Sequence, residues 1–228
     1  MKNKSGLTIS VLVIVAVFLS CNLPLNAATT KQAVTETVAP SGDLQAAPEA
    51  TAAPVYAAAR LTAADLPEGF RELTAEELEA LGFSSAQFTN AFAGMLSEAQ
   101  PENFAAFTNT NGSFEVIVSV LMAPLSALER LVVDLYLRDP QQLANDFSAA
   151  GGIAGLAYDE SAQPVGEASG SVVFSVPDAP LKMIGGLTVA RRGEVLQIAL
   201  LFYPDGTQPA LASYAVAEIV DGKLANLE

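Results

Sequence analysis

The chain has 228 residues, 51% of them hydrophobic, and its 25 acidic residues outnumber 11 basic ones to give a net charge of −14. Such an acidic surface repels phosphate backbones and anionic lipid headgroups, which argues against nucleic acid as a partner. The chain has no histidine and a single cysteine. This composition excludes Ser-His-Asp and Cys-His catalysis, zinc sites that use imidazole, and an internal disulfide.

Residues 1–20 have the pattern of a secretory signal peptide. Lys2 and Lys4 give a positively charged start, and residues 11–19 form an unbroken apolar run of nine. A helix needs about 20 apolar residues to cross a bilayer, so a spanning anchor is the weaker alternative. The sequence therefore predicts an exported protein whose leader is removed.

Residues 18–21 (Phe-Leu-Ser-Cys) resemble the lipobox of bacterial lipoproteins. The resemblance implies that Cys21 carries the lipid, palmitate included, and becomes the new N-terminus. The implied location is the cell membrane, facing outside the cytoplasm, or the outer membrane in a cell with two membranes. Several acyl chains hold a protein stably, because each buried CH₂ contributes about 0.8 kcal/mol. Phe18 stands where this class usually has leucine, so cleavage by an ordinary signal peptidase near residues 26–28 is an open alternative.

Residues 21–60 are interpreted as a lipidated, disordered tether rich in Ala, Thr and Pro. Its prolines and its lack of large apolar residues at helical or strand spacing prevent a core from forming. As a flexible coil this segment spans on the order of 35 Å, enough to hold a domain clear of the headgroups. The remaining residues, 61–228, are predicted to form one globular domain.

Two capping boxes predict helices at the start of this domain. Thr74 and Glu77 open a short helix that Gly82 ends, and Ser84 and Gln87 open a second. The second helix has apolar residues at the i, i+3, i+4, i+7, i+8 spacing of an amphipathic face. They are Phe88, Ala91, Phe92, Met95 and Leu96.

A β-hairpin is predicted next. Residues 103–109 and 114–122 are strand candidates that flank Asn111 and Gly112, a strong turn signal. Alternate residues of the second strand, from Phe114 to Met122, are all apolar, so one face of that strand is expected in the core.

Two helices are expected after the hairpin. Pro124 begins the first, and its predicted core-facing residues follow helical spacing: Leu128, Leu131, Val132 and Leu135. Asp139 caps the second helix with Pro140 at its first position, and glycines 151 and 152 close it. Its predicted inward residues are Leu143 and Phe147.

The last third of the chain has the pattern of a β-meander. Strands are predicted at residues 153–158, 171–176, 181–190 and 194–203, with a polar loop at 163–170 and a tight turn at 191–193. A closing helix is predicted at residues 209–225. Its expected inward residues are Leu211, Ala215, Ile219 and Val220.

This order of elements predicts an α+β fold. We expect a single domain in which an antiparallel sheet, made of the hairpin and the C-terminal β-meander, is covered by helices. The order is similar to that of extracytoplasmic α/β/α lipoprotein domains of the PsbP-like kind. That resemblance rests on element order, has no matching motif and implies no site residue.

Acidic residues are the first candidates for a site. Glu76, Glu77 and Glu79 could form an acid/base or calcium cluster, but carboxylates in the first turns of a helix are usually solvated and favour the helix dipole. Asp159 and Glu160 lack the ligand spacing of a calcium loop. Asp205 and Asp221 each precede a glycine, a pattern typical of turns and helix ends.

Three other motifs have a structural reading beside a functional one. Glycines 151, 152 and 155 follow a predicted helix and open a strand, which is the wrong order for a phosphate-binding loop. Arg191 and Arg192 could grip an anion, but arginines at a hairpin tip are usually exposed and solubilising. Residues 111–113 match a glycosylation triplet that the hairpin turn explains.

We therefore expect no catalytic residue, no cofactor and no metal site, and a protein that is not an enzyme. The favoured hypothesis is a non-catalytic binding or accessory domain that docks a protein partner in the cell envelope. A carrier or sensor of an apolar small molecule or lipid is the first alternative, and a carboxylate-based hydrolase the second. A large exposed apolar patch favours docking, a closed apolar cavity favours the carrier, and convergent carboxylates with shifted pKa values favour the hydrolase.

Overall fold

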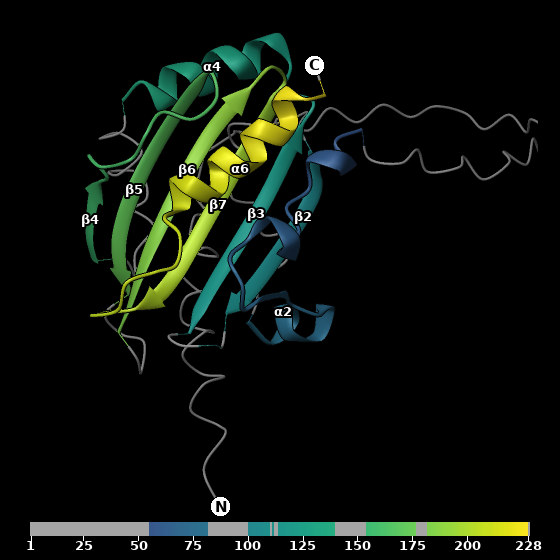
Figure 1. The fold of residues 1–228 in the computed structure, drawn as a ribbon. Coiled ribbons are helices and arrows are strands. Elements are labelled where there is room, and N and C mark those ends of the chain that lie inside the picture. Colours follow the sequence, from purple (N-terminus) through teal and green to yellow (C-terminus); the bar gives the residue numbers. More distant parts are fainter. Residues whose placement is uncertain are drawn as a thin grey trace, which may run out of the picture.

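The computed structural model describes residues 55–81, 100–109, 111, 114–139, 154–176 and 182–227 (Figure 1). The predicted leader, Cys21 and the tether up to residue 54 lie outside these residues. So do most of the predicted helix beginning at Ser84 and the predicted helix after Asp139.

In the described residues, seven antiparallel strands form one open sheet in the order β1-β2-β3-β7-β6-β5-β4 (Figure 1). The strands are β1 (Phe70–Glu72), β2 (Gln100–Asn109), β3 (Glu115–Ala123), β4 (Ala154–Tyr158), β5 (Ala168–Val176), β6 (Met183–Arg192) and β7 (Val195–Pro204). The predicted hairpin is β2 and β3, and the predicted meander is β4 to β7. The pairing of β3 with β7 joins these two units, and the predicted α+β class is confirmed.

Three α-helices and two short 3₁₀ helices accompany the sheet in the described residues. They are α2 (Ala75–Leu81), α4 (Ala127–Leu137), α6 (Ser213–Ala225), η1 (Ala57–Ala59) and η2 (Ala63–Asp65). Helix α6 lies across one face of the sheet, while α4 lies over one end of it and contacts β5 and β6 (Figure 1).

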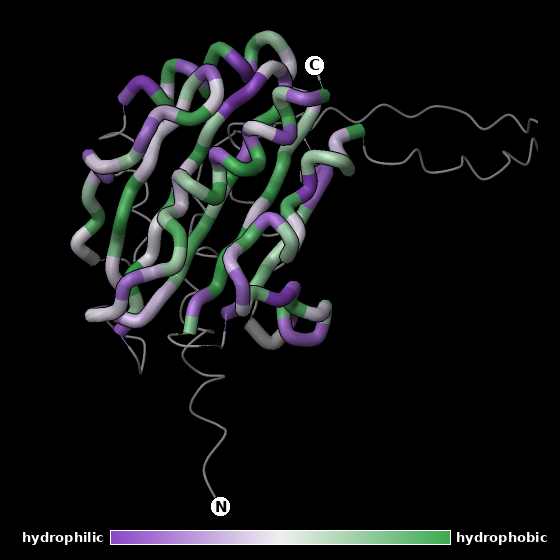
Figure 2. The backbone as a smooth tube through the Cα atoms, in the orientation of Figure 1, coloured by the Kyte–Doolittle hydropathy of each residue, from purple (hydrophilic) through white to green (hydrophobic). Residues whose placement is uncertain are grey.

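Both faces of the sheet are apolar and buried, because side chains of a strand alternate between the two faces. On β3, Val116, Val118 and Val120 belong to the cluster that includes α4, whereas Ile117 and Leu121 belong to the cluster that includes α6. The hydropathy view shows hydrophobic colour running along the central strands (Figure 2). The sheet is thus the middle layer of the domain.

Helix α4 presents a different face to the sheet from the one predicted. Glu129, Val133 and Leu137 are its buried residues. All four residues predicted to face the core are exposed, with exposed fractions of 70% for Leu128, 56% for Leu131, 38% for Val132 and 56% for Leu135. The prediction of its inward face was wrong, and the helix also begins three residues later than Pro124.

Contacts of α4 explain this rotation. Ser126 caps the helix: its side chain accepts a hydrogen bond from the Glu129 backbone, and the Ser126 N–H donates one to the Glu129 carboxylate at 2.8 Å. Asp134 bonds Arg191 of β6. These two sets of hydrogen bonds orient Glu129 and Asp134 toward the domain. The face of α4 that bears Leu128, Leu131 and Leu135 is therefore turned toward solvent.

Helix α6 is also rotated relative to the prediction. Val220 is buried as expected, but Val216, Ala217 and Leu224 are the other buried apolar residues. Leu211 and Ile219 pack only partly against the same cluster. Ser213 begins the helix and is buried, and its hydroxyl shares a hydrogen bond with that of Thr188 on β6.

Further differences lie at the ends of elements. Strand β1 was not predicted from the sequence, because a strand of three residues is too short to show an alternating pattern of apolar and polar residues. Strand β5 begins at Ala168, inside the predicted polar loop. Tyr56 and Ala59, which the sequence analysis placed in the tether, pack against the α6 side of the sheet. The Tyr56 carbonyl also accepts a hydrogen bond from Asn103 of β2 at 2.7 Å.

Candidate functional site

The acidic cluster on α2 forms a helix cap and a surface ion pair. Glu77 accepts hydrogen bonds from the Thr74 backbone at 2.9 Å and from both terminal nitrogens of Arg71 at 2.9 and 2.7 Å. The Arg71 hydrogen bonds, followed by that from Thr74, lower the pKa of Glu77 to about 2. Glu76 and Glu79 are exposed. The carboxylate with the shifted pKa is thus held ionised by its partners, and the predicted capping box is confirmed.

The other acidic candidates have local partners. Asp159 accepts hydrogen bonds from the backbone and hydroxyl of Ser161, as in an Asx turn. Asp205 pairs with Lys182, which lowers the pKa of the aspartate. Within the described residues, no group of three or more Cys, Asp or Glu side chains is placed to hold a metal ion.

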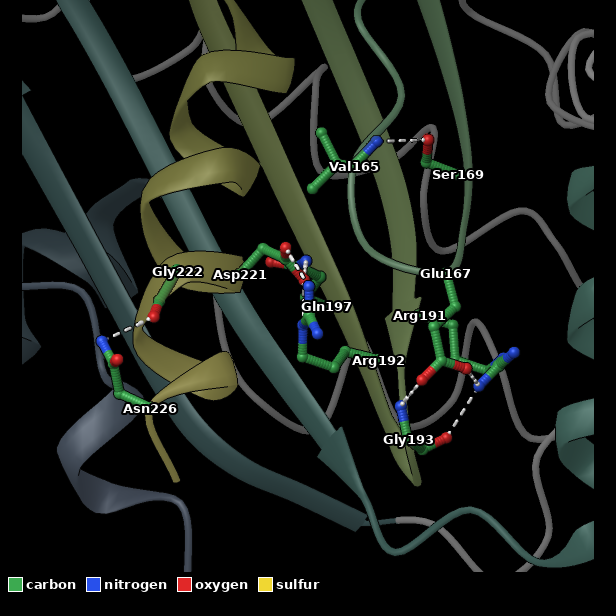
Figure 3. A network of polar contacts seen from close by, with 10 residues as sticks. All are labelled: Val165, Glu167, Ser169, Arg191, Arg192, Gly193, Gln197, Asp221, Gly222 and Asn226. Carbon is green, nitrogen blue, oxygen red and sulfur yellow. Dashed lines mark hydrogen bonds and ion pairs between the residues drawn. The ribbon is translucent and has the colours of Figure 1, made fainter. Parts of the chain in front are cut away.

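Arg191 lies inside the domain and joins three segments. Its side chain is only 9% exposed. It donates two hydrogen bonds to Asp134 of α4 at 2.5 and 3.0 Å, and one to Glu167 at 2.6 Å. Glu167 also accepts the Gly193 N–H, and that bond, followed by the Arg191 bond, lowers the pKa of Glu167 (Figure 3). Arg191 therefore joins the hairpin tip to α4 and to the start of β5.

Arg192 makes the corresponding contact on the other face of the sheet. Its guanidinium donates two hydrogen bonds to Asp221 of α6 at 2.7 and 2.8 Å (Figure 3). Gln197 of β7 lies beside the same carboxylate. Consecutive strand residues point to opposite faces, so the Arg191 and Arg192 pair connects α4 and α6 through one turn. Both the anion-binding and the exposed, solubilising interpretations of this pair are replaced by an internal ion-pair network.

The glycine and asparagine motifs lie partly outside the described residues. Residues 151–153, 112 and 113 are among those not described. Gly155 is in β4 with φ +59°, a backbone conformation that glycine adopts readily. The Asn111 N–H donates to the Asn109 side chain at 3.0 Å, a turn contact at the end of β2.

Within the described residues, the outer surface of α4 is a feature that the fold does not explain. Leu128, Leu131, Val132 and Leu135 form one stripe along the helix, and we call this stripe the α4 face. Figure 2 shows α4 as a run of alternating hydrophobic and hydrophilic turns at the end of the sheet. The helical spacing of these residues indicates one shared face, but the prediction that this face lies in the core was wrong. The Ser126–Glu129 capping box is the sequence signal that would have helped to orient the helix.

Comparison with known proteins adds no assignment. No family model, no curated protein and no solved structure matches this chain. Among the described helices, none combines the length and apolar character needed to cross a membrane.

Proposed function

We propose that this chain is a lipid-anchored extracytoplasmic protein whose domain docks a protein partner of the cell envelope through the α4 face. The observation that carries this proposal is the exposure of four large aliphatic side chains in one stripe. Each exposed apolar Å² costs about 25 cal/mol relative to burial, so a contiguous stripe is a characteristic of binding surfaces. The carboxylate-based hydrolase is less well supported, because arginine and backbone hydrogen bonds lower the pKa values of Glu77 and Glu167 and so hold both carboxylates ionised.

Position within the fold supports a binding role for the stripe. Val133 and Leu137 already attach α4 to the sheet, and Ser126 caps it. Since Leu131 and Leu135 are both 56% exposed, the fold itself does not require them to be apolar. A surface that is apolar without a folding reason is best explained by a second molecule that covers it.

The lipid anchor rests on the lipobox resemblance at Cys21. In this proposal, acylated Cys21 holds the protein at the membrane, and residues 22–54 let the domain reach its partner. Flexible linkers raise the effective concentration of a tethered domain near other envelope proteins, so a modest α4 contact is sufficient for binding.

A pair of matched variants tests the docking role. The full-length protein is purified with its partners from the envelope of cells that make it, after mild cross-linking. We expect Leu131→Gln/Leu135→Gln to abolish capture of the partner. Leu227→Gln, which changes a leucine 44% exposed outside α4, should leave capture intact.

Stability measurements make this test decisive. The α4 double variant should keep its free energy of unfolding within about 1 kcal/mol of the parent, as surface substitutions do. If the double variant unfolds, these leucines belong to the core. If it folds and captures the same proteins as the Leu227→Gln control, docking occurs elsewhere and the proposal fails.

A further inference from the structure

Positive charge is distributed unevenly over the described residues. The described residues contain eight Lys and Arg side chains, and six of them form ion pairs with carboxylates. The six pairs are Arg60–Glu72, Arg71–Glu77, Lys182–Asp205, Arg191–Asp134, Arg192–Asp221 and Lys223–Asp65. Arg130 and Arg138 have no ion pair within the described part of the chain, and both are exposed.

These two arginines belong to the helix that bears the apolar stripe. Arg130 lies in α4 and Arg138 is its C-terminal cap. At 1.5 Å per residue they lie about 12 Å apart along the helix axis, on either side of Leu131 and Leu135 in the sequence. The α4 face is therefore apolar with a border of two exposed arginines, the second followed directly by the exposed Asp139, on a chain whose net charge is −14.

The acidic residues of α4 do not neutralise this border. Asp134 is four residues from both Arg130 and Arg138, the spacing at which helical ion pairs form. Instead, both carboxylate oxygens of Asp134 accept hydrogen bonds from Arg191. Glu129 is buried in the cap with Ser126. The fold thus uses the carboxylates of the helix internally and leaves its arginines for another molecule.

Resting on the proposed function, we infer that the partner is a protein segment with an apolar centre and acidic residues beside it. An acidic partner is repelled by the rest of this strongly negative surface and meets opposite charge at α4, which fixes where it docks. Arginine presents a planar fork suited to carboxylates, so aspartate or glutamate side chains are the expected partners of Arg130 and Arg138.

Two other occupants fit these charges less well. In a second copy packed face to face, the α4 acids Glu129 and Asp134 are already engaged, so neither is available to the arginines. An anionic bilayer would extend over a wide area around α4 and meet carboxylates such as Glu167, which is 47% exposed. A narrow acidic and apolar segment avoids both problems.

Site-specific photo-cross-linking tests this inference in the full-length, membrane-attached protein. A photoreactive side chain replaces Leu128, at the edge of the stripe, and the cross-linked peptide is identified by mass spectrometry. We expect a protein adduct whose peptide has Asp or Glu next to apolar residues. Arg130→Gln/Arg138→Gln should reduce the adduct roughly tenfold, the loss expected for two charge-assisted contacts. Lys182→Gln, a change at an exposed cation outside α4, is the matched control.

The outcomes separate this inference from the proposed function. Arg130→Lys/Arg138→Lys should retain most of the adduct, and raising the salt concentration should weaken the adduct in the parent and in this lysine variant but not in the glutamine variant. The inference fails if the Arg130→Gln/Arg138→Gln variant gives the same amount of adduct, or if the cross-linked peptide contains no acidic residue. Either result leaves the proposed docking function standing. An adduct to lipid or to a second copy of this chain overturns the inference and replaces the partner class. If no adduct forms and the Leu131→Gln/Leu135→Gln variant captures its partner normally, both the inference and the proposed function fail.

Discussion

The aromatic ring of Phe174 on β5 covers Gly185 on β6, its direct neighbour in the sheet. A Cβ atom built at Gly185 would lie 2.3 Å from two ring carbons of Phe174. The same ring packs edge-on against Phe202 of β7, with centroids 6.0 Å apart and planes at 75°. Glycine at 185 therefore makes room for an aromatic pair that fills the α4 side of the core.

Gly185→Ala should destabilise the domain by about 1–3 kcal/mol, the usual cost of overpacking a filled core. Phe174→Leu in the same chain should recover part of that loss, because the smaller side chain vacates the ring position. Urea unfolding followed by circular dichroism measures each variant. Gly222→Ala is the control: it lies within α6 with nothing within 4 Å of the added carbon, so we expect a gain of about 0.5–1 kcal/mol. Equal effects of the two substitutions would contradict the packing argument.

Arg191→Met should cost about 2 kcal/mol of unfolding free energy. It removes the side chain that joins Asp134 and Glu167, leaving two carboxylates close together without their cation. We expect less than the full penalty of a buried pair, because water reaches both carboxylates. Lys182→Met breaks an exposed pair with Asp205 and should change stability far less. Chemical denaturation checks both, and a loss of similar size for the two would refute the internal role of Arg191.

The phenol of Tyr56 should titrate at about pH 12. Burial is the largest cause of its raised pKa, and its hydrogen bond to Glu194 at 2.6 Å is the next. A raised pKa means that the folded protein holds the proton more tightly than the unfolded chain. The resulting stability is complete below pH 10 and is lost as the pH rises from 10 to 12.

The chain has no tryptophan, so absorbance at 295 nm follows its five tyrosines directly. The difference between the parent and Tyr56→Phe isolates this group. Glu194→Gln should bring the midpoint closer to 10, since it removes the negative charge beside the phenol. A difference spectrum with its midpoint at 10 in the folded parent would show that Tyr56 is not held by Glu194.

Cys21→Ser should release the protein from membranes without unfolding its domain. Lipid attachment needs the thiol, and residue 21 precedes the domain predicted at residues 61–228. Fractionation of the cells followed by mass spectrometry of the N-terminus checks this outcome. Firm membrane association of the serine variant, or a mature chain that begins beyond residue 21, would refute lipid anchoring.

Local signals in the sequence were sufficient for strands β2 to β7 and for one helix start. Alternation in residues 114–122 predicted β3, and the glycine at 193, which has φ +53°, marked the turn between β6 and β7. The Thr74 and Glu77 pair predicted the start of α2. Such signals act over a few residues, so they do not depend on the rest of the fold.

The orientation of helices could not be predicted in the same way. Helical spacing shows that Leu128, Leu131 and Leu135 share a face, but it does not show which molecule covers that face. The rotation of α4 depends on Asp134 meeting Arg191, which lies 57 residues later in the chain. A contact at that distance follows from the sheet order, and only the structure supplies it.

The neighbouring arginines at the end of β6 have a consequence for alignment of the strand. Arg191 and Arg192 are the same residue type. If β6 slipped by one position, each face of the sheet would still receive one guanidinium, so these ion pairs discriminate poorly against a shifted register. Thr188 does discriminate, since its hydroxyl bonds Ser171 at 2.8 Å and Ser213 at 3.0 Å. A displaced Leu187 or Val189 would leave those serines without that partner. The correct alignment of β6 is therefore specified by a single buried threonine more than by the charged pair.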